Sequence, residues 1–197
     1  MDINAKQVKE LRDKTGAGMM DCKKALKETK GDLEKAIDYL RKKGIQSASS
    51  KFGRKASNGV IASYIHMNGK VGVLLEVNCE TDFVAKTPDF NDLVKNITLQ
   101  IAAANPKYLK REEVPDDIIQ KEKEVYLTQA ENMNKPKHVL DKIAEGKLNK
   151  FYQEVCLLEQ AYIRDTDKTI NQLVLEAIAK LGENIIVKRF VRYELGE

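Results

Sequence analysis

Side chains that commonly carry out chemistry are few in this sequence, and they are widely spaced. The two histidines, His66 and His138, lie far apart, one beside a predicted turn and the other near a predicted helix start. The three cysteines form no C-x-x-C pair and have no neighbouring histidine, so the spacing of a zinc site is missing. We therefore predict exposed histidines, no bound metal or cofactor, and buried, reduced thiols at Cys22, Cys79 and Cys156.

Nucleotide-binding and hydrolytic motifs are also missing. Gly16-Ala17-Gly18 begins like a dinucleotide loop, but Asp21 occupies the third glycine position and a helix pattern precedes the loop instead of a strand. The patterns of P-loops, zinc proteases, serine hydrolases and calcium loops do not occur. The sequence thus predicts neither direct nucleotide binding nor enzymatic activity, although an unrecognised site around Cys79 and Asp82 stays open as an alternative.

The segment TDFVAK, residues 81–86, carries the most distinctive side chains. A large aromatic residue, Phe83, follows an acid, Asp82, at the end of a predicted strand and just before a predicted helix. Loops held between rigid elements are where recognition groups usually lie. Two interpretations follow from the residues alone: Phe83 fills the local core while Asp82 satisfies backbone donors, or the two side chains recognise a partner.

The elements before this segment form a small helical region. Asn4 and Gln7 suggest a capped first helix, and a second helix is expected to turn Met19, Cys22 and Leu26 inward. A third helix, capped by an aspartate, is expected to end at Gly44. We predict a three-helix domain at 1–44, followed by a linker rich in Ser, Gly and Lys at 45–59.

The remaining residues, 60–197, predict an α+β core domain with an antiparallel sheet. A hairpin is expected around Met67-Asn68-Gly69-Lys70, where Asn-Gly suits a type I′ turn. Thr87-Pro88 predicts the start of a buried helix. Residues 115–155 predict a protruding antiparallel helical hairpin that turns at Lys135-Pro136. The last elements expected are a helix with a capping box at Thr169 and Gln172, a stop at Gly182, and a strand over 185–195.

Composition narrows the class of protein. With 197 residues, 42% of them apolar, the chain can bury a substantial core. Its formal net charge is only +4, and it has neither a signal-peptide pattern nor an apolar run that could cross a membrane. We therefore expect a cytoplasmic protein. The cluster Lys51, Arg54 and Lys55 leaves an RNA-binding accessory module as the alternative, but no aromatic stacking platform accompanies it.

Two long segments, TGAGMMDCKKAL at 15–26 and VNCETDFVAK at 77–86, resemble the signature stretches of the elongation factor Ts family in its short bacterial form. The likeness continues through IAAANPKYL, KPKHVLDKIAEGKLNKF and LGENIIVKRF, so that it covers essentially the whole chain. The resemblance implies a ubiquitin-associated-like helical domain, a linker and an α+β core that carries a helical hairpin.

The resemblance also implies a function. It suggests a guanine-nucleotide exchange factor that binds the GTPase domain of elongation factor Tu and promotes GDP release during translation elongation. Thr81, Asp82, Phe83 and Val84 match the family segment that disturbs the Mg²⁺ and phosphate site of the GTPase, with Phe83 as a wedge. Arg12, Met19 and Met20 would dock on the same domain, and Met20 is the methionine expected to be more exposed.

The sequence departs from longer members of this family because it holds one copy of the strand-and-helix half of the core. The small sheet predicts a homodimer around residues 185–195, with an apolar face that Arg189 interrupts. A monomer whose hairpin at 60–79 covers the last strand is the competing expectation. The apolar face would comprise Ile185, Val187, Val191 and Tyr193, opposite Lys188, Arg192 and Glu194.

Overall fold

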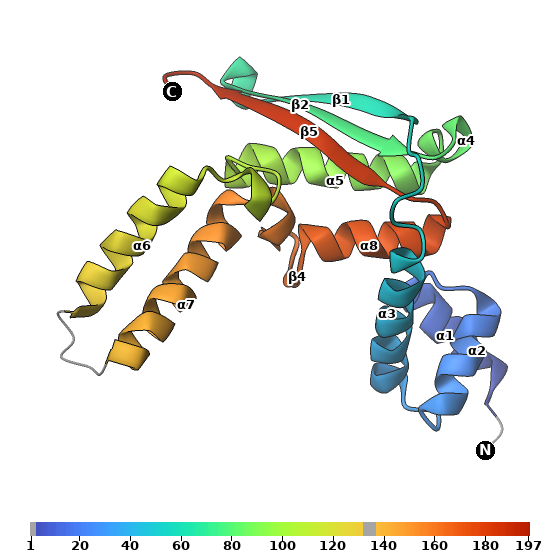
Figure 1. Cartoon of the computed structure of the whole chain (residues 1–197). Coiled ribbons are helices and arrows are strands. Elements are labelled where there is room, and N and C mark those ends of the chain that lie inside the picture. The colour runs from blue at the N-terminus through green and yellow to red at the C-terminus, as the bar shows by residue number, and fades with distance from the viewer. Residues whose placement is uncertain (1–2, 132–136) are drawn as a thin grey trace. The chain divides into compact units, whose positions relative to one another are not determined.

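The computed structural model describes residues 3–131 and 137–197 (Figure 1). Its helices and antiparallel sheets confirm the α+β class. The elements, in chain order, are α1 (Ala5–Thr15), α2 (Met19–Glu28), α3 (Leu33–Ser49), β1 (Asn58–His66), η1 (Met67–Gly69), β2 (Val71–Cys79), α4 (Asp82–Ala85), α5 (Pro88–Ala104), η2 (Arg111–Glu113), α6 (Asp116–Glu131), α7 (Lys137–Val155), η3 (Leu157–Glu159), β3 (Ala161–Tyr162), β4 (Asp165–Thr169), α8 (Ile170–Leu181) and β5 (Ile186–Glu194).

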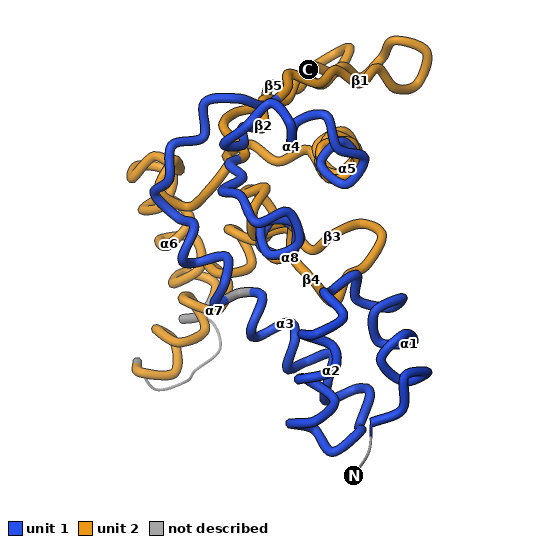
Figure 2. The backbone as a smooth tube through the Cα atoms, turned by 90° about the vertical axis from the view of Figure 1, so that its right-hand side faces the viewer, with its two compact units in different colours: residues 1–59, 78–91, 174–186 blue, residues 60–77, 92–173, 187–197 orange. Residues whose placement is uncertain are grey.

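The chain forms two compact units, each assembled from segments that are distant in sequence (Figure 2). The first unit holds residues 1–59, 78–91 and 174–186, and the second holds 60–77, 92–173 and 187–197. The segment 81–86 therefore belongs to the same unit as helices α1 to α3. The division into domains at residues 44 and 59 stays a prediction.

Helices α1, α2 and α3 form a small bundle with its own core. The predicted capping box is present, because Asn4 accepts from the backbone of Lys6 while Gln7 bonds back to the Asn4 backbone. Asp32 caps α3 as expected. The core consists of buried side chains from all three helices: Val8, Leu11, Cys22, Ala25, Leu26 and Ala36.

Helix α3 is longer than predicted, because it continues through Gly44 and ends at Ser49. The expected stop at Gly44 is wrong for a physical reason. Gly44 does not adopt the positive φ of a helix-ending glycine. Instead, a Cβ added there would lie 3.4 Å from the Cβ of Ala179 in α8, so the glycine permits close packing of two helices within the first unit. The buried Ala48 extends the packed face of α3 beyond it.

The three-stranded sheet has the order β1-β2-β5, and the predicted hairpin and last strand are both present. The loop differs from a two-residue type I′ turn, because Met67 as well as Asn68 and Gly69 has a positive φ. Helix α5 runs along one face of the sheet (Figure 1). Alternate residues of β2 are buried, as are apolar residues of α5: Val71, Val73, Leu75 and Val77 in the strand, and Leu93, Val94, Ile97 and Ile101 in the helix.

Helices α6 and α7 lie side by side as a hairpin in the second unit (Figure 1). A small cluster at its base includes Leu148, Tyr152 and Cys156, with Ile119 and Tyr126 of α6 packed against it. The predicted turn at Lys135-Pro136 lies outside the described residues.

Helix α8 begins and ends as the sequence predicts. The Thr169 hydroxyl accepts from the Gln172 backbone, and the Gln172 side chain accepts from the Thr169 backbone. Gly182, with a φ of 76°, follows the last turn. The short hairpin of β3 and β4 just before α8 was not predicted, because its few residues show no clear alternation of apolar side chains.

Candidate partner-binding surface

Within the segment 81–86, where a loop was expected, residues Asp82–Ala85 form a single helical turn, α4. Thr81 caps this turn, because its hydroxyl accepts a hydrogen bond from the backbone N–H of Val84 at 3.3 Å. Val84 and Ala85 are buried and anchor the turn. Phe83 is 77% exposed, so the interpretation that it fills the local core is wrong. The turn thus presents a large aromatic side chain to solvent.

Asp82 and Lys86 form an ion pair on the exposed side of this turn. Their charged atoms are 2.7 Å apart, at the i,i+4 spacing of a helix. The hydrogen bond from Lys86 is the main cause that holds the pKa of Asp82 below its ordinary value. Backbone N–H groups of Asp82 and Phe83 also lower the pKa of this carboxyl group, so Asp82 serves backbone donors of the turn while its charge is paired with Lys86.

Glu183, just after α8, holds the entry to this turn. One of its carboxylate oxygens, Oε2, accepts from the backbone N–H groups of Glu80 and Thr81, at 3.1 and 3.0 Å. The other, Oε1, accepts from the hydroxyl of Thr81 at 2.6 Å. The three groups lie within the first compact unit, although 102 positions separate Thr81 from Glu183.

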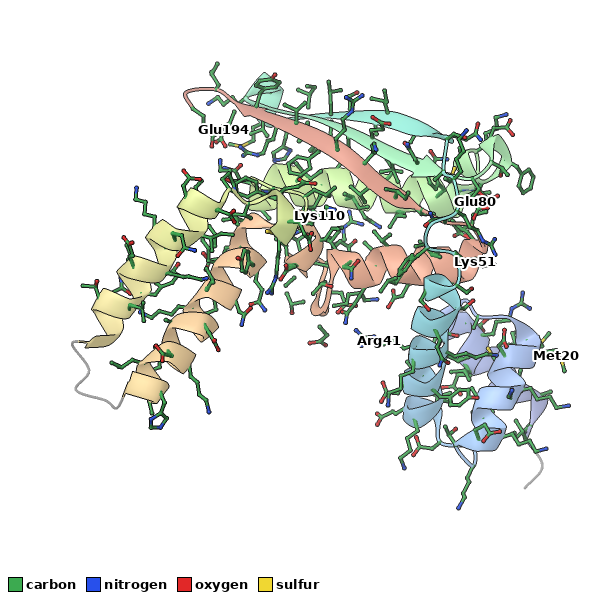
Figure 3. All side chains as sticks on the ribbon, viewed as in Figure 1. Met20, Arg41, Lys51, Glu80, Lys110 and Glu194 are labelled. Carbon is green, nitrogen blue, oxygen red and sulfur yellow. The ribbon has the colours of Figure 1, made fainter. Side chains whose placement is uncertain are left out.

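A second set of hydrogen bonds includes one that the segment after α8 donates to the end of β2. Glu80, which lies where β2 ends (Figure 3), accepts from the backbone N–H of Asn184 at 2.7 Å. The buried Asn184 side chain donates to the carbonyl of Arg54 at 2.8 Å, and Asn58 donates to the carbonyl of Glu80 at 2.7 Å. The strand end before α4 and the segment after α8 are therefore tied together at several points.

Arg54, one residue of the basic cluster considered for RNA binding, takes part in this arrangement. The guanidinium of Arg54 lies 3.7 Å from the carboxylate of Glu80. Because the carbonyl of the same residue accepts from Asn184, Arg54 has a clear structural role. This pairing leaves less free positive charge for a nucleic acid.

Cys79 is poorly suited to act as a nucleophile, because it is buried and its thiol donates to the carbonyl oxygen of Thr81 at 3.1 Å. Burial is the main cause that raises the pKa of Cys79, and the charge of Glu183 adds to it. Reactive cysteines need the thiolate, which such surroundings disfavour. This environment argues against an enzymatic site around Cys79 and Asp82.

The other predicted contact residues lie on the three-helix bundle. Arg12 is exposed on α1, and Met20 is exposed on α2 (Figure 3). Met20 is 75% exposed and Met19 is 55% exposed. The expectation that Met19 turns inward with Cys22 is therefore wrong. Met19 is the first residue of α2, after the cap Gly18, and its side chain lies beyond the buried core.

The two glycines near these methionines end one helix and start the next. Gly16 has a φ of 66° and donates its N–H to the carbonyl of Arg12 at 2.7 Å, as a C-terminal cap does. Gly18 precedes the first turn of α2. The Gly-Ala-Gly sequence thus connects two helices, whereas a dinucleotide-binding loop would follow a strand.

The three thiols are free and buried, and both histidines are exposed, as predicted. No group of three or more His, Cys, Asp or Glu side chains suited to a metal ion occurs within residues 3–131 and 137–197. In the same parts of the chain, no helix combines the length and apolar character needed to cross a membrane. Glu183 is the contact that residue patterns missed, because a glutamate after a helix stop carries no local signal of its distant partners.

A family model described as "Elongation factor TS" matches residues 5–197. The chain belongs to this family. Three relatives named "Elongation factor Ts" support the assignment. The proteins of Caldanaerobacter subterraneus and Moorella thermoacetica are each 60% identical over 195 residues, covering 99% of this chain and 98% and 96% of their own lengths. The protein of Geobacter metallireducens is 59% identical over 197 residues, covering all of this chain and 91% of its own length.

Proposed function

We propose that this chain is a guanine-nucleotide exchange factor that binds elongation factor Tu carrying GDP and promotes GDP release in the cytoplasm. The observation that carries the proposal is the exposed Phe83 on a turn whose neighbouring residues are buried or hydrogen-bonded. A large apolar side chain held out into water by a fixed backbone is suited to insertion into a partner. Such a factor acts by binding and needs no covalent step.

The turn 81–84 is proposed to disturb the Mg²⁺ and phosphate site in the GTPase domain of the partner. Phe83 would act as the wedge, with the ionised Asp82 as its polar neighbour. Thr81 and Val84 would set the position of the turn, because the hydroxyl of one caps it and the side chain of the other is buried. By linkage, a factor that weakens GDP binding must itself be bound more weakly when nucleotide is present.

The bundle of α1 to α3 is proposed to be a ubiquitin-associated-like domain that supplies a second contact. Met20 and Met19 present flexible apolar side chains that suit an adaptable protein interface. Arg12 is exposed on the adjoining helix. A second contact on the same chain raises the effective concentration of the first, so the two would strengthen each other.

The direct test is release of labelled GDP from elongation factor Tu, measured with and without this protein. We expect release to accelerate in proportion to the added protein until the GTPase is saturated. Absence of acceleration, together with demonstrated binding, would exclude exchange activity. Hydrolysis of GTP by this protein alone would contradict the proposal that it is a binding factor.

A homodimer formed through the sheet is proposed as well. The face of the sheet opposite α5 carries exposed apolar side chains from all three strands: Ile61, Ile65, Leu74 and Tyr193. A Cβ at Gly72 would lie 3.4 Å from the side chain of Ile65, which places β1 and β2 side chains on one face. Exposed apolar sheet faces favour association.

The structure changes the residues expected at this interface. Ile185 and Val187 are already buried within the chain, whereas Tyr193 is exposed. Arg189, which interrupts the apolar face, forms an ion pair with Glu76 at 2.7 Å. The exposed face within the described residues therefore centres on β1 and β2 together with the end of β5.

Sedimentation at micromolar concentrations tests the dimer. We expect about twice the 22.3 kDa of one chain, and we expect Leu74→Lys at the centre of the face to give the monomer mass. A charge buried in an apolar interface is strongly unfavourable, so one substitution suffices. A wild-type protein that stays at the mass of one chain would contradict the dimer.

A further inference from the structure

We propose that Glu183 is a positioning residue for Phe83, acting through Thr81. This inference rests on the proposed exchange function. It assigns to a residue 102 positions away from Thr81 the task of setting the conformation of the turn that carries the wedge. Glu183 itself need not touch the partner.

The hydroxyl of Thr81 shows how the connection works. A threonine hydroxyl can donate only one hydrogen bond, and Thr81 donates it to Glu183 at 2.6 Å. Its oxygen lone pairs are then free to accept the backbone N–H of Val84, which closes the α4 turn. A carboxylate partner therefore orients the hydroxyl in the only sense that lets it cap the helix.

The charge of Glu183 has a further use. Its Oε2 atom accepts two successive backbone N–H groups, from Glu80 and Thr81. Charge-assisted hydrogen bonds of this kind are stronger than neutral ones. An amide side chain in place of the carboxylate would retain only one acceptor oxygen, so it could not reproduce the whole set of bonds.

The short turn needs this external support. A helix of four residues cannot offset the entropy of ordering its backbone with internal hydrogen bonds. The bond from Asn184 back to Glu80 holds the segment that bears Glu183 against the same strand end. The direction of Phe83 is therefore set by hydrogen bonds between residues 80–81 and residues 183–184, which belong to the first unit.

A positioning role makes a specific kinetic prediction. If Phe83 samples other directions, fewer bound complexes place the wedge correctly, while the contacts of the three-helix bundle still support association. Glu183→Gln is therefore expected to lower the maximal rate of stimulated GDP release about tenfold, with a much smaller change in the concentration needed for half-maximal rate. A control, Glu145→Gln, removes the same charge from an exposed position of α7 and should leave both parameters unchanged.

Substitutions at Thr81 test the same connection from the other side. Thr81→Val removes the hydroxyl while preserving the shape of the side chain, and it should lower the maximal rate to a similar extent. Thr81→Ser restores a hydroxyl and should recover most of the rate. Combining Thr81→Val with Glu183→Gln should cost less than the product of the two separate effects, because both disrupt one interaction.

A measurement on the protein alone separates this inference from the proposed function. Glu183→Gln should accelerate amide hydrogen exchange at Glu80, Thr81 and Val84 about tenfold, with little change in the three-helix bundle. If the wild-type chain stimulates GDP release and Glu183→Gln keeps its full maximal rate, the positioning role is wrong while the function stands. If the wild-type chain does not stimulate release, the proposed function fails and the positioning role fails with it. Should Glu183→Gln not fold, the comparison of Thr81→Val with Thr81→Ser decides: equal rates for both would overturn the inference.

Discussion

Two exposed apolar side chains, Phe83 and Met20, are held out into solvent by very different means. Met20 lies on a helix of 10 residues whose other face packs into a core made by its own neighbours along the chain. Phe83 lies on a turn of four residues whose entry is held by hydrogen bonds donated to the carboxylate of Glu183. The first surface is local in origin, and the second depends on distant contacts.

The difference teaches what each surface requires to be functional. A helix in a bundle keeps its exposed face as long as the apolar core stays formed. A single turn keeps its direction only while particular donors and acceptors stay paired. We therefore expect mutations far from Phe83 to impair its action, whereas the methionine surface should respond mainly to changes in the bundle itself.

The largest expected effect is that of Phe83→Ala. It should lower stimulated GDP release about a hundredfold, because a central aromatic side chain commonly dominates its part of an interface. Thermal unfolding should be unchanged, since the side chain is exposed in the free protein. Phe52→Ala, at another exposed phenylalanine of the same unit, is the matched control. Normal exchange by a folded Phe83→Ala protein would contradict the wedge.

A smaller effect is expected at the methionine surface. Met20→Ala should weaken binding to elongation factor Tu about tenfold, and Met19→Ala should weaken it less, because Met20 exposes more of its side chain. A binding titration measures both, with Met67→Ala in the sheet hairpin as the control for loss of a methionine. Equal affinity of all three variants and the wild type would show that these methionines of the bundle do not contribute to the interface.

Thiol reactivity compares the stability of the two regions directly. Cys22 reports on opening of the bundle, and Cys79 reports on opening at the start of the Phe83 turn. Burial raises the pKa of Cys79, so the thiol stays protonated in the folded protein below its ordinary pKa of 9.0. The contribution of this thiol to the stability of the folded state falls as the pH rises above that value. We expect Glu183→Gln to increase labelling of Cys79 about tenfold at pH 7 without changing labelling of Cys22.

Mass spectrometry of the labelled peptides separates the three thiols. Cys156 serves as the internal reference, because burial raises its pKa to about 11 and it lies in the second unit. Equal acceleration at Cys22 and Cys79 would show that Glu183 stabilises the whole unit and not the turn in particular.

The smallest effect is expected for Lys86→Gln. Removing the hydrogen bond from Lys86 should raise the pKa of Asp82 toward its ordinary value, which an NMR titration of the carboxyl group would detect. In the wild type the ion pair is present above that ordinary value and is lost as the pH falls through the lowered pKa of Asp82. Because both side chains are exposed, thermal stability should not change measurably. A pKa of Asp82 that is the same in both proteins would exclude the pair in solution.

Features that depend on nearby residues could be predicted well. The capping boxes at Asn4 and Thr169 and the start of α5 at Thr87-Pro88 each involve groups within a few positions of one another. The hairpin around Gly69 likewise depends on backbone angles that few residues adopt. The predictions of these caps and of the presence of the hairpin were correct because local sterics and hydrogen bonding decide them.

Errors arose where a residue's role depends on what packs against it. A glycine often follows the last turn of a helix, so Gly44 predicted a helix end. In the structure it instead allows close packing against Ala179. Met19 has the spacing of a core residue, but the core ends before it. In both cases the periodicity within one helix carries no information about where the neighbouring helix lies.

The candidate site divides along the same line. The sequence by itself determined that TDFVAK carries an aromatic and an acid between a strand and a capped helix, and its resemblance identified the family. Only the tertiary structure decided that Val84 turns inward and Phe83 outward, and that Glu183 accepts the hydroxyl of Thr81. The physical reason is that a hydrogen bond depends on distance in space, whereas 102 positions of intervening chain leave that distance undefined until the whole unit has folded.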